Sequence, residues 1–168
     1  PMVHAVDSVL PRIADVARSR GPVDVLCLQE VAINYAEMGG GDTVDQAAEL
    51  AALFPGYAPV FGAGVDAHAP DGRRRFGNMI LSRLPVLDAA THPLPRPVEA
   101  GVIHMPRAAL ACLIGTERGS ALRVMTTHLE FHSANQRLAQ ATRLRAIHGE
   151  AAGNDRARAP LGRSARRR

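Results

Sequence analysis

The feature that most constrains the fold is a short, almost wholly apolar run, Val23 to Leu28, followed directly by Gln29 and Glu30. A run of this length and composition predicts a strand covered on both faces. It stands between two segments, 7–20 and 45–54, in which apolar residues recur at helical spacing. We therefore expect Glu30 at the end of a buried strand, at a sheet edge where α/β proteins place their chemistry.

The rest of the chain predicts further strands and one more helix. Strand-like segments follow at 57–61, 76–81, 86–90, 107–114 and 122–129. The polar segment 62–74 and the proline-rich segment 92–105 predict loops. Ser133 and Gln136 fit a capping box that opens a final helix, whose apolar face is expected to consist of Ala134, Leu138, Ala141, Leu144 and Ile147. This order predicts a layered α/β protein with much antiparallel pairing.

The charge is unevenly distributed along the 168 residues. Six of the 20 basic residues lie in 156–168, so residues 1–155 carry 14 arginines against 16 acidic residues, a net of −2. The body is therefore not expected to bind nucleic acid by charge alone. Residues 151–168 are expected to form a disordered, arginine-rich tail after a domain that spans residues 1–150.

The cysteine pattern and the hydropathy bear on the compartment. Cys27 and Cys112 each stand in an apolar run and show neither disulfide-framework nor zinc spacing, so we expect buried free thiols. No segment has the length and composition of a transmembrane helix, and no signal peptide is apparent. These features favour a cytoplasmic protein.

Three stretches and one arginine combine residue types suited to phosphate chemistry. They are Leu28-Gln29-Glu30, Gly77-Asn78-Met79-Ile80-Leu81-Ser82-Arg83, Thr127-His128-Leu129, and Arg107 at the start of a predicted strand. In this order and spacing they resemble the endonuclease/exonuclease/phosphatase family of metal-dependent phosphoesterases and deoxyribonuclease-like enzymes. The resemblance covers roughly residues 5–150. It implies an α/β sandwich of four layers, in which two mostly antiparallel sheets are flanked by helices.

The resemblance also implies roles for individual residues. Glu30 would hold Mg²⁺ or Mn²⁺, while His128, Arg107 and Asn78 would form the catalytic group around the scissile phosphate. These roles agree with the chemistry, because a carboxylate suits Mg²⁺ and an arginine can bind phosphate bidentately. The substrate would be a phosphoester of nucleic acid, of a lipid head group or of a sugar.

Other family motifs have no counterpart in this sequence. An asparagine before the first helix, a Gly-Asp-x-Asn motif and a Ser-Asp-His motif are not found. We therefore expect an incomplete sandwich, truncated at both ends, catalytically incomplete, and able to self-associate through exposed sheet edges.

Two alternatives belong to other functional classes. One is a non-catalytic remnant of the fold, and the other is a nucleic-acid-binding module that acts through the basic tail. A zinc site at His128 and His132 is disfavoured, because the zinc-protease motif needs a glutamate directly after the first histidine, on a helix.

Overall fold

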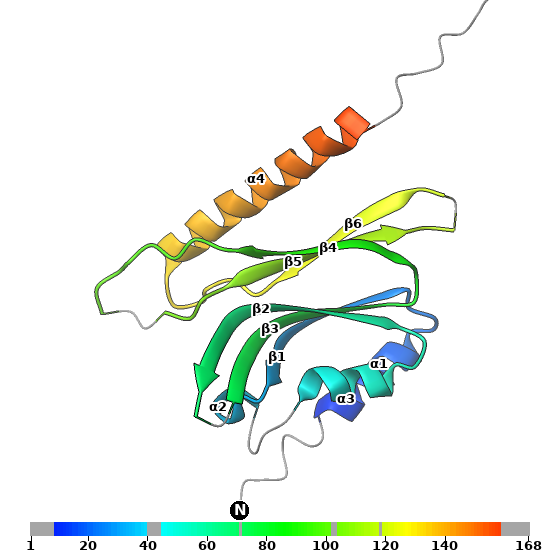
Figure 1. Ribbon diagram of the computed structural model, residues 1–168, viewed down its shortest axis with the longest axis horizontal. Coiled ribbons are helices and arrows are strands. Elements are labelled where there is room, and N and C mark those ends of the chain that lie inside the picture. The colour runs from blue at the N-terminus through cyan, green and yellow to red at the C-terminus, as the bar shows by residue number, and fades with distance from the viewer. Residues whose placement is uncertain (1–8, 40–44, 71, 102–103, 118, 159–168) are drawn as a thin grey trace, which may run out of the picture.

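The computed structural model describes residues 9–39, 45–70, 72–101, 104–117 and 119–158. Two three-stranded antiparallel sheets pack face to face between helices, which gives four layers (Figure 1). The first sheet has the order β1-β3-β2 and the second the order β4-β5-β6. The elements in chain order are α1 Val9–Ser19, β1 Val25–Ile33, α2 Ala36–Gly39, α3 Gln46–Leu53, β2 Ala58–Ala69, β3 Gly72–Ser82, β4 Val86–Pro93, β5 Ala108–Gly115, β6 Ala121–Thr127 and α4 Ala134–Arg158. The expected α/β sandwich is confirmed.

Each interface between layers has its own apolar core. Leu50, Met79 and Leu81 lie between the first sheet and the helices α1 and α3. Ile80 and Leu110 fill the space between the two sheets. A third cluster, which includes Ala109, Leu144 and Ile147, lies between the second sheet and α4, the long helix at the top of Figure 1. Because side chains alternate along β3 and β5, each of these strands contributes to two cores.

Strand β1 differs from the sequence prediction in position and burial. It is an edge strand of the first sheet, so Cys27 is exposed, while Val25, Leu26 and Leu28 are only partly buried. The expectation that Cys27 is buried is therefore wrong, whereas Cys112 on the central strand β5 is buried as expected. Both cysteines are free thiols.

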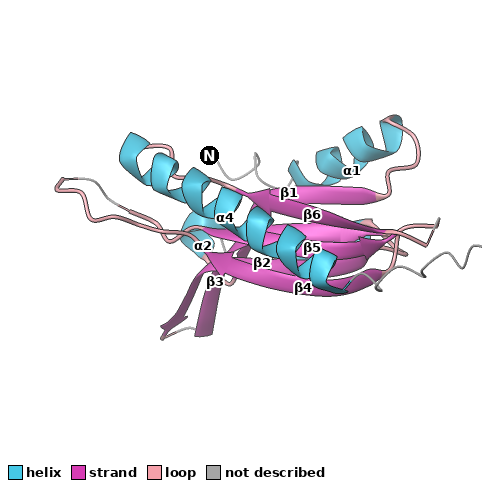
Figure 2. Ribbon diagram, turned by 90° about the horizontal axis from the view of Figure 1, so that it is seen from above, coloured by secondary structure: helices cyan, strands magenta, loops and turns pink. Residues whose placement is uncertain are grey.

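The segment 62–74, expected to be a loop, is instead a strand hairpin. β2 continues to Ala69 and pairs with β3 from Gly72 onward, and Figure 2 shows this hairpin extending beyond the other strands. The Arg73–Asp66 ion pair, with Nε 2.6 Å from Oδ1, lies across this extension. Polar and charged side chains there face solvent, which is why the sequence has the composition of a loop.

The N-terminus of helix α4 forms as predicted, but its buried face differs. The Ser133 hydroxyl accepts a hydrogen bond from the Gln136 N–H at 3.1 Å, so half of the capping box is present. The Gln136 side chain instead donates to the Pro97 carbonyl at 2.9 Å, and Gln140 donates to the Pro95 carbonyl at 3.3 Å. The proline-rich loop cannot pair as a strand, so its carbonyls need such donors.

As a consequence, the buried face of α4 is partly polar. Gln136, Gln140 and Ile147 are buried, whereas Leu138 is 69% exposed, so the expected apolar face is only partly right. The helix runs on to Arg158, into the segment expected to be a tail, and residues 159–168 lie outside the described residues. None of the helices in the described part of the chain is long and apolar enough to cross a membrane.

Candidate active site

The four residues selected from the sequence lie together at one end of the space between the sheets. Glu30 comes from β1, Asn78 from β3, Arg107 from the residue before β5, and His128 from the residue after β6. They line a small pocket, here called the Glu30 pocket, together with Gly64, Phe76, Gly77, Pro106 and Ala108. Its free volume is about 10 Å³, room for roughly one water molecule or ion. A substrate would therefore meet these residues from outside the pocket.

A bulge in β1 places Glu30 in this pocket. Leu28 pairs with Met79 and Val31 pairs with Gly77, so Gln29 and Glu30 together lie opposite the single residue Asn78. Glu30 has a φ of 59°, a left-handed conformation that is uncommon for a residue with a side chain. The strand does not end at Glu30, as the sequence suggested, but continues to Ile33. The bulge thus brings the carboxylate beside Asn78.

Gln29, the other bulge residue, connects the two sheets. Its side-chain Nε2 donates to the carbonyl of Thr127 at 2.6 Å, at the end of β6. The hydroxyl of Thr127 donates to the Ala108 carbonyl at 3.0 Å, and Asn78 Nδ2 donates to the same carbonyl at 2.9 Å. These bonds fix the start of β5, and with it Arg107, against both sheets.

His128 contacts both a carboxylate and a guanidinium through one ring nitrogen. Its Nδ1 lies 2.9 Å from Glu30 Oε1 and 3.3 Å from Arg107 Nη1. One nitrogen cannot donate to the first and accept from the second at the same time. The shorter distance is to a carboxylate oxygen, which can only accept, so an Nδ1–H that donates to Glu30 is favoured. With Nδ1 so engaged, Nε2 is the ring nitrogen that can meet a substrate.

Arg107 is held by a second, buried carboxylate, Glu130. Arg107 Nε lies 3.6 Å from Glu130 Oε2, and the two side chains are 8% and 1% exposed. The second carboxylate oxygen, Oε1, accepts the His132 N–H at 2.9 Å. Burial raises the pKa of Glu130, but the His132 N–H and the charge of Arg107 outweigh it, so its pKa lies below the usual 4.5. Glu130 is therefore a carboxylate at neutral pH.

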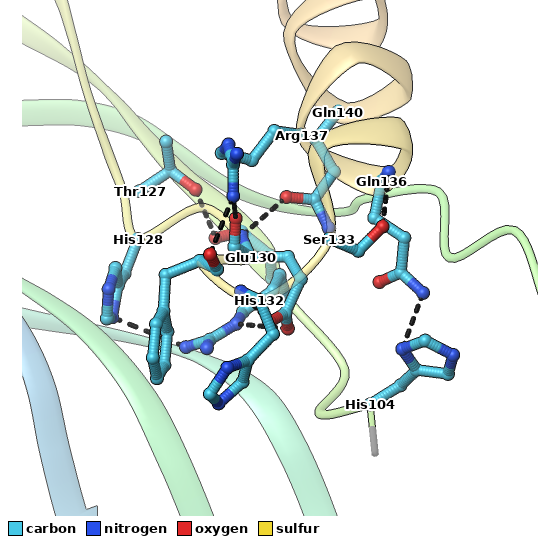
Figure 3. A network of polar contacts seen from close by, with 12 residues as sticks. His104, Thr127, His128, Glu130, His132, Ser133, Gln136, Arg137 and Gln140 are labelled. Carbon is cyan, nitrogen blue, oxygen red and sulfur yellow. Dashed lines mark hydrogen bonds and ion pairs between the residues drawn. The ribbon is translucent and has the colours of Figure 1, made fainter. Parts of the chain in front are cut away.

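The first turns of α4 fix the backbone around Glu130 (Figure 3). The Glu130 N–H donates to Gln140 Oε1 at 2.9 Å. Arg137 Nη1 donates to the carbonyl of Phe131 at 2.7 Å and to that of Glu130 at 3.2 Å. The side chains of Arg137 and Gln140 thus fix the turn after His128 through hydrogen bonds to its backbone. The sequence showed no partner for Glu130, because Gln140, Arg107 and Glu130 meet only through tertiary packing.

The comparisons with known proteins agree with this fold. The model of the Endonuclease/Exonuclease/phosphatase family matches residues 6–161. The chain is similar to a solved endonuclease/exonuclease/phosphatase from Beutenbergia cavernae DSM 12333, with 27% identity and a TM-score of 0.60, over 78% of this chain and 36% of that one. It shares its fold with the catalytic domain of human Nocturnin, solved with bound sulfate anion, with 20% identity and a TM-score of 0.55, over 86% of this chain and 51% of that one. The chain thus spans about a third and about half of their lengths, and no curated protein matches it significantly.

Proposed function

Because the chain belongs to the endonuclease/exonuclease/phosphatase family, we propose that Glu30, Asn78, Arg107 and His128 form a metal-dependent site for phosphoester hydrolysis. Family membership supports a hydrolase of the phosphoesterase or nuclease type. The assignment of the site rests on the position of these four residues. They come from separate motifs, far apart in the sequence, and line a single pocket.

The residues at the pocket fit a divalent cation in donor type, size and charge. Glu30 Oε1 contacts His128, which leaves Oε2 for a hard cation such as Mg²⁺ or Mn²⁺, and the space beside it has the size of one ion. Glu30 and Glu130 set two carboxylates against the one guanidinium of Arg107, which leaves one negative charge when His128 is neutral. Within the described part of the chain no three His, Cys, Asp or Glu side chains gather, so water and substrate oxygens would complete the ligand set.

The residues of the pocket would bind the phosphoester and hold one another in position. A bound cation would neutralise charge on the phosphoryl oxygens. Arg107, in an ion pair with Glu130 at 3.6 Å, would direct its Nη donors to a phosphoryl oxygen. His128, held through Nδ1 by Glu30, would present Nε2 to the phosphoester. Asn78 would hold Arg107 in place through the Ala108 carbonyl.

The test is hydrolysis of bis-p-nitrophenyl phosphate with Mg²⁺ or Mn²⁺ by the full chain and by Glu30→Gln. We expect turnover that requires the metal and falls by roughly two orders of magnitude or more in the variant. Glu49→Gln, an exposed glutamate on α3, is the matched control and should retain full activity. Circular dichroism would show that all three proteins are folded.

The alternative is a protein that keeps the family fold without its chemistry. The incomplete ligand set among the described residues favours this reading over other non-enzymatic ones. Folded wild-type protein with no metal-dependent turnover, or turnover equal in wild type and Glu30→Gln, would support the alternative.

A further inference from the structure

A second, larger pocket lies directly beside the proposed catalytic group. It has a free volume of about 360 Å³, against about 10 Å³ for the Glu30 pocket. The two pockets share Gly64, Pro106, Arg107 and Ala108 as a common wall. We call this second space the Arg96 pocket, because Arg96 lines it and takes no part in the Glu30 pocket.

The Arg96 pocket is positively charged, although the body of the protein is not. Its charged lining residues are Arg96 and Arg107, and none of the described residues that line it is acidic. Glu130 balances Arg107, so the net positive charge comes from Arg96. Within the described residues, no carboxylate lies within ion-pair distance of Arg96, whereas Arg73, Arg83 and other arginines do have such partners.

Resting on the proposed function, we propose that the Arg96 pocket binds a second phosphate group of the same substrate. A substrate phosphoester at His128 and Arg107 has the Arg96 pocket next to it across the shared wall. A guanidinium binds the oxygens of a phosphate in bidentate fashion, and the open volume accommodates the group with its water. The preferred substrate class is therefore a phosphoester that carries a further phosphate nearby.

Gly64 permits this arrangement. A Cβ at Gly64 would come within 2.9 Å of the Pro106 carbonyl oxygen and 3.3 Å of the Ala108 backbone N. The absence of a side chain lets β2 approach the segment that carries Arg107, at a position that lines both pockets.

Binding measurements test the second phosphate without requiring turnover. Titration calorimetry on the full chain would compare thymidine 3′,5′-bisphosphate with thymidine 5′-monophosphate, and fructose 1,6-bisphosphate with fructose 6-phosphate. We expect at least one bisphosphate to bind roughly 10- to 100-fold more tightly than its monophosphate, the range for hydrogen bonds to a charged group. A gain in only one pair would identify the nucleotide or the sugar as the source of the phosphate.

Variants assign the effect to the pocket. Arg96→Gln should remove the bisphosphate gain, so that each bisphosphate binds no more tightly than its monophosphate, and Arg96→Lys should restore part of the gain. Arg83→Gln is the matched control, because Arg83 is an exposed arginine paired with Asp24 beyond the far end of β3. Arg96 is exposed, so its replacement should leave the fold intact.

The outcomes separate this proposal from the proposed function. Equal binding of bisphosphates and monophosphates, or a gain that persists in Arg96→Gln, would overturn the second-phosphate pocket even if the chain hydrolyses phosphodiesters. An Arg96-dependent gain without any turnover would support the pocket and leave the hydrolytic proposal refuted.

Discussion

The buried ion pair between Glu130 and Arg107 gives the sharpest prediction about stability. Replacing Glu130 by glutamine keeps the shape of the side chain and removes its charge. The glutamine oxygen can still accept the His132 N–H, but its amide N–H₂ would then face Arg107 Nε, donor against donor. The variant therefore leaves a guanidinium buried without its counter-charge.

The expected cost follows from the geometry. Opposite charges 3.6 Å apart attract by about 4–5 kcal/mol at an effective dielectric constant of about 20. Breaking a buried pair on one side typically costs about 3–5 kcal/mol, and the retained hydrogen bond reduces that loss. We expect the free energy of unfolding to fall by about 2–4 kcal/mol, which lowers Tm by roughly 5–15 °C for a chain of this size.

The pH dependence of this cost has a definite sign. The pKa of Glu130 in the folded protein lies below its usual value of 4.5, so the pair contributes fully above pH 4.5. The contribution declines as the pH falls from there through the lower folded pKa, where wild-type Glu130 also becomes neutral. The difference between wild type and Glu130→Gln should therefore be constant from pH 7 to about 5 and shrink below 4.5.

Urea unfolding at several pH values measures this difference, with Glu150→Gln as the control. Glu150 also pairs with an arginine, Arg143, at 2.7 Å, but its side chain is 60% exposed, so its loss should cost under about 1 kcal/mol. If Glu130→Gln costs no more than Glu150→Gln, or if the gap does not shrink in acid, the reasoning about burial is refuted.

Three further predictions concern close packing, exposed thiols and a buried hydrogen bond. Gly77→Ala should destabilise the protein by more than about 3 kcal/mol in urea unfolding, because its Cβ would lie 2.1 Å from the Gly62 carbonyl oxygen, whereas Gly149→Ala on open helix surface should stabilise it by about 0.5–1 kcal/mol. Native protein should react with Ellman's reagent at Cys27 and not at Cys112 until urea is added, since only Cys27 is exposed, and equal rates would contradict the structure. Gln140→Leu should cost about 1–3 kcal/mol in the same unfolding assay, because it leaves the buried Glu130 N–H without an acceptor, and a neutral change would show that water replaces it.

Much of the layer order could be predicted from the sequence, because it depends on local patterns. The helices α1 and α3 and the strands β3, β5 and β6 occur near their expected places, since hydrophobic periodicity and caps are read within a few residues. Ser133, for example, was expected to cap α4, and its hydroxyl accepts the Gln136 N–H at 3.1 Å. Burial was predicted less well. Cys27 has apolar neighbours like those of Cys112, and only the position of β1 at the sheet edge makes it exposed.

The site shows the same division at finer scale. Motifs identified Glu30 and His128, but they did not show what brings the two residues together. Two register irregularities in the first sheet, on either side of the same part of β3, do so. β1 bulges at Gln29–Glu30, and the pairing of β2 with β3 shifts between Ala63 and Val65, around Gly64, so that the segment Gly77–Asn78 lies between two disrupted ladders. Bulges bend a sheet and redirect side chains, and here the two disrupted positions also supply pocket-lining residues. A strand continuing regularly past Glu30 would move the following residues to the opposite faces. The register of three strands, more than the identity of any one residue, therefore determines whether the carboxylate of Glu30 reaches His128.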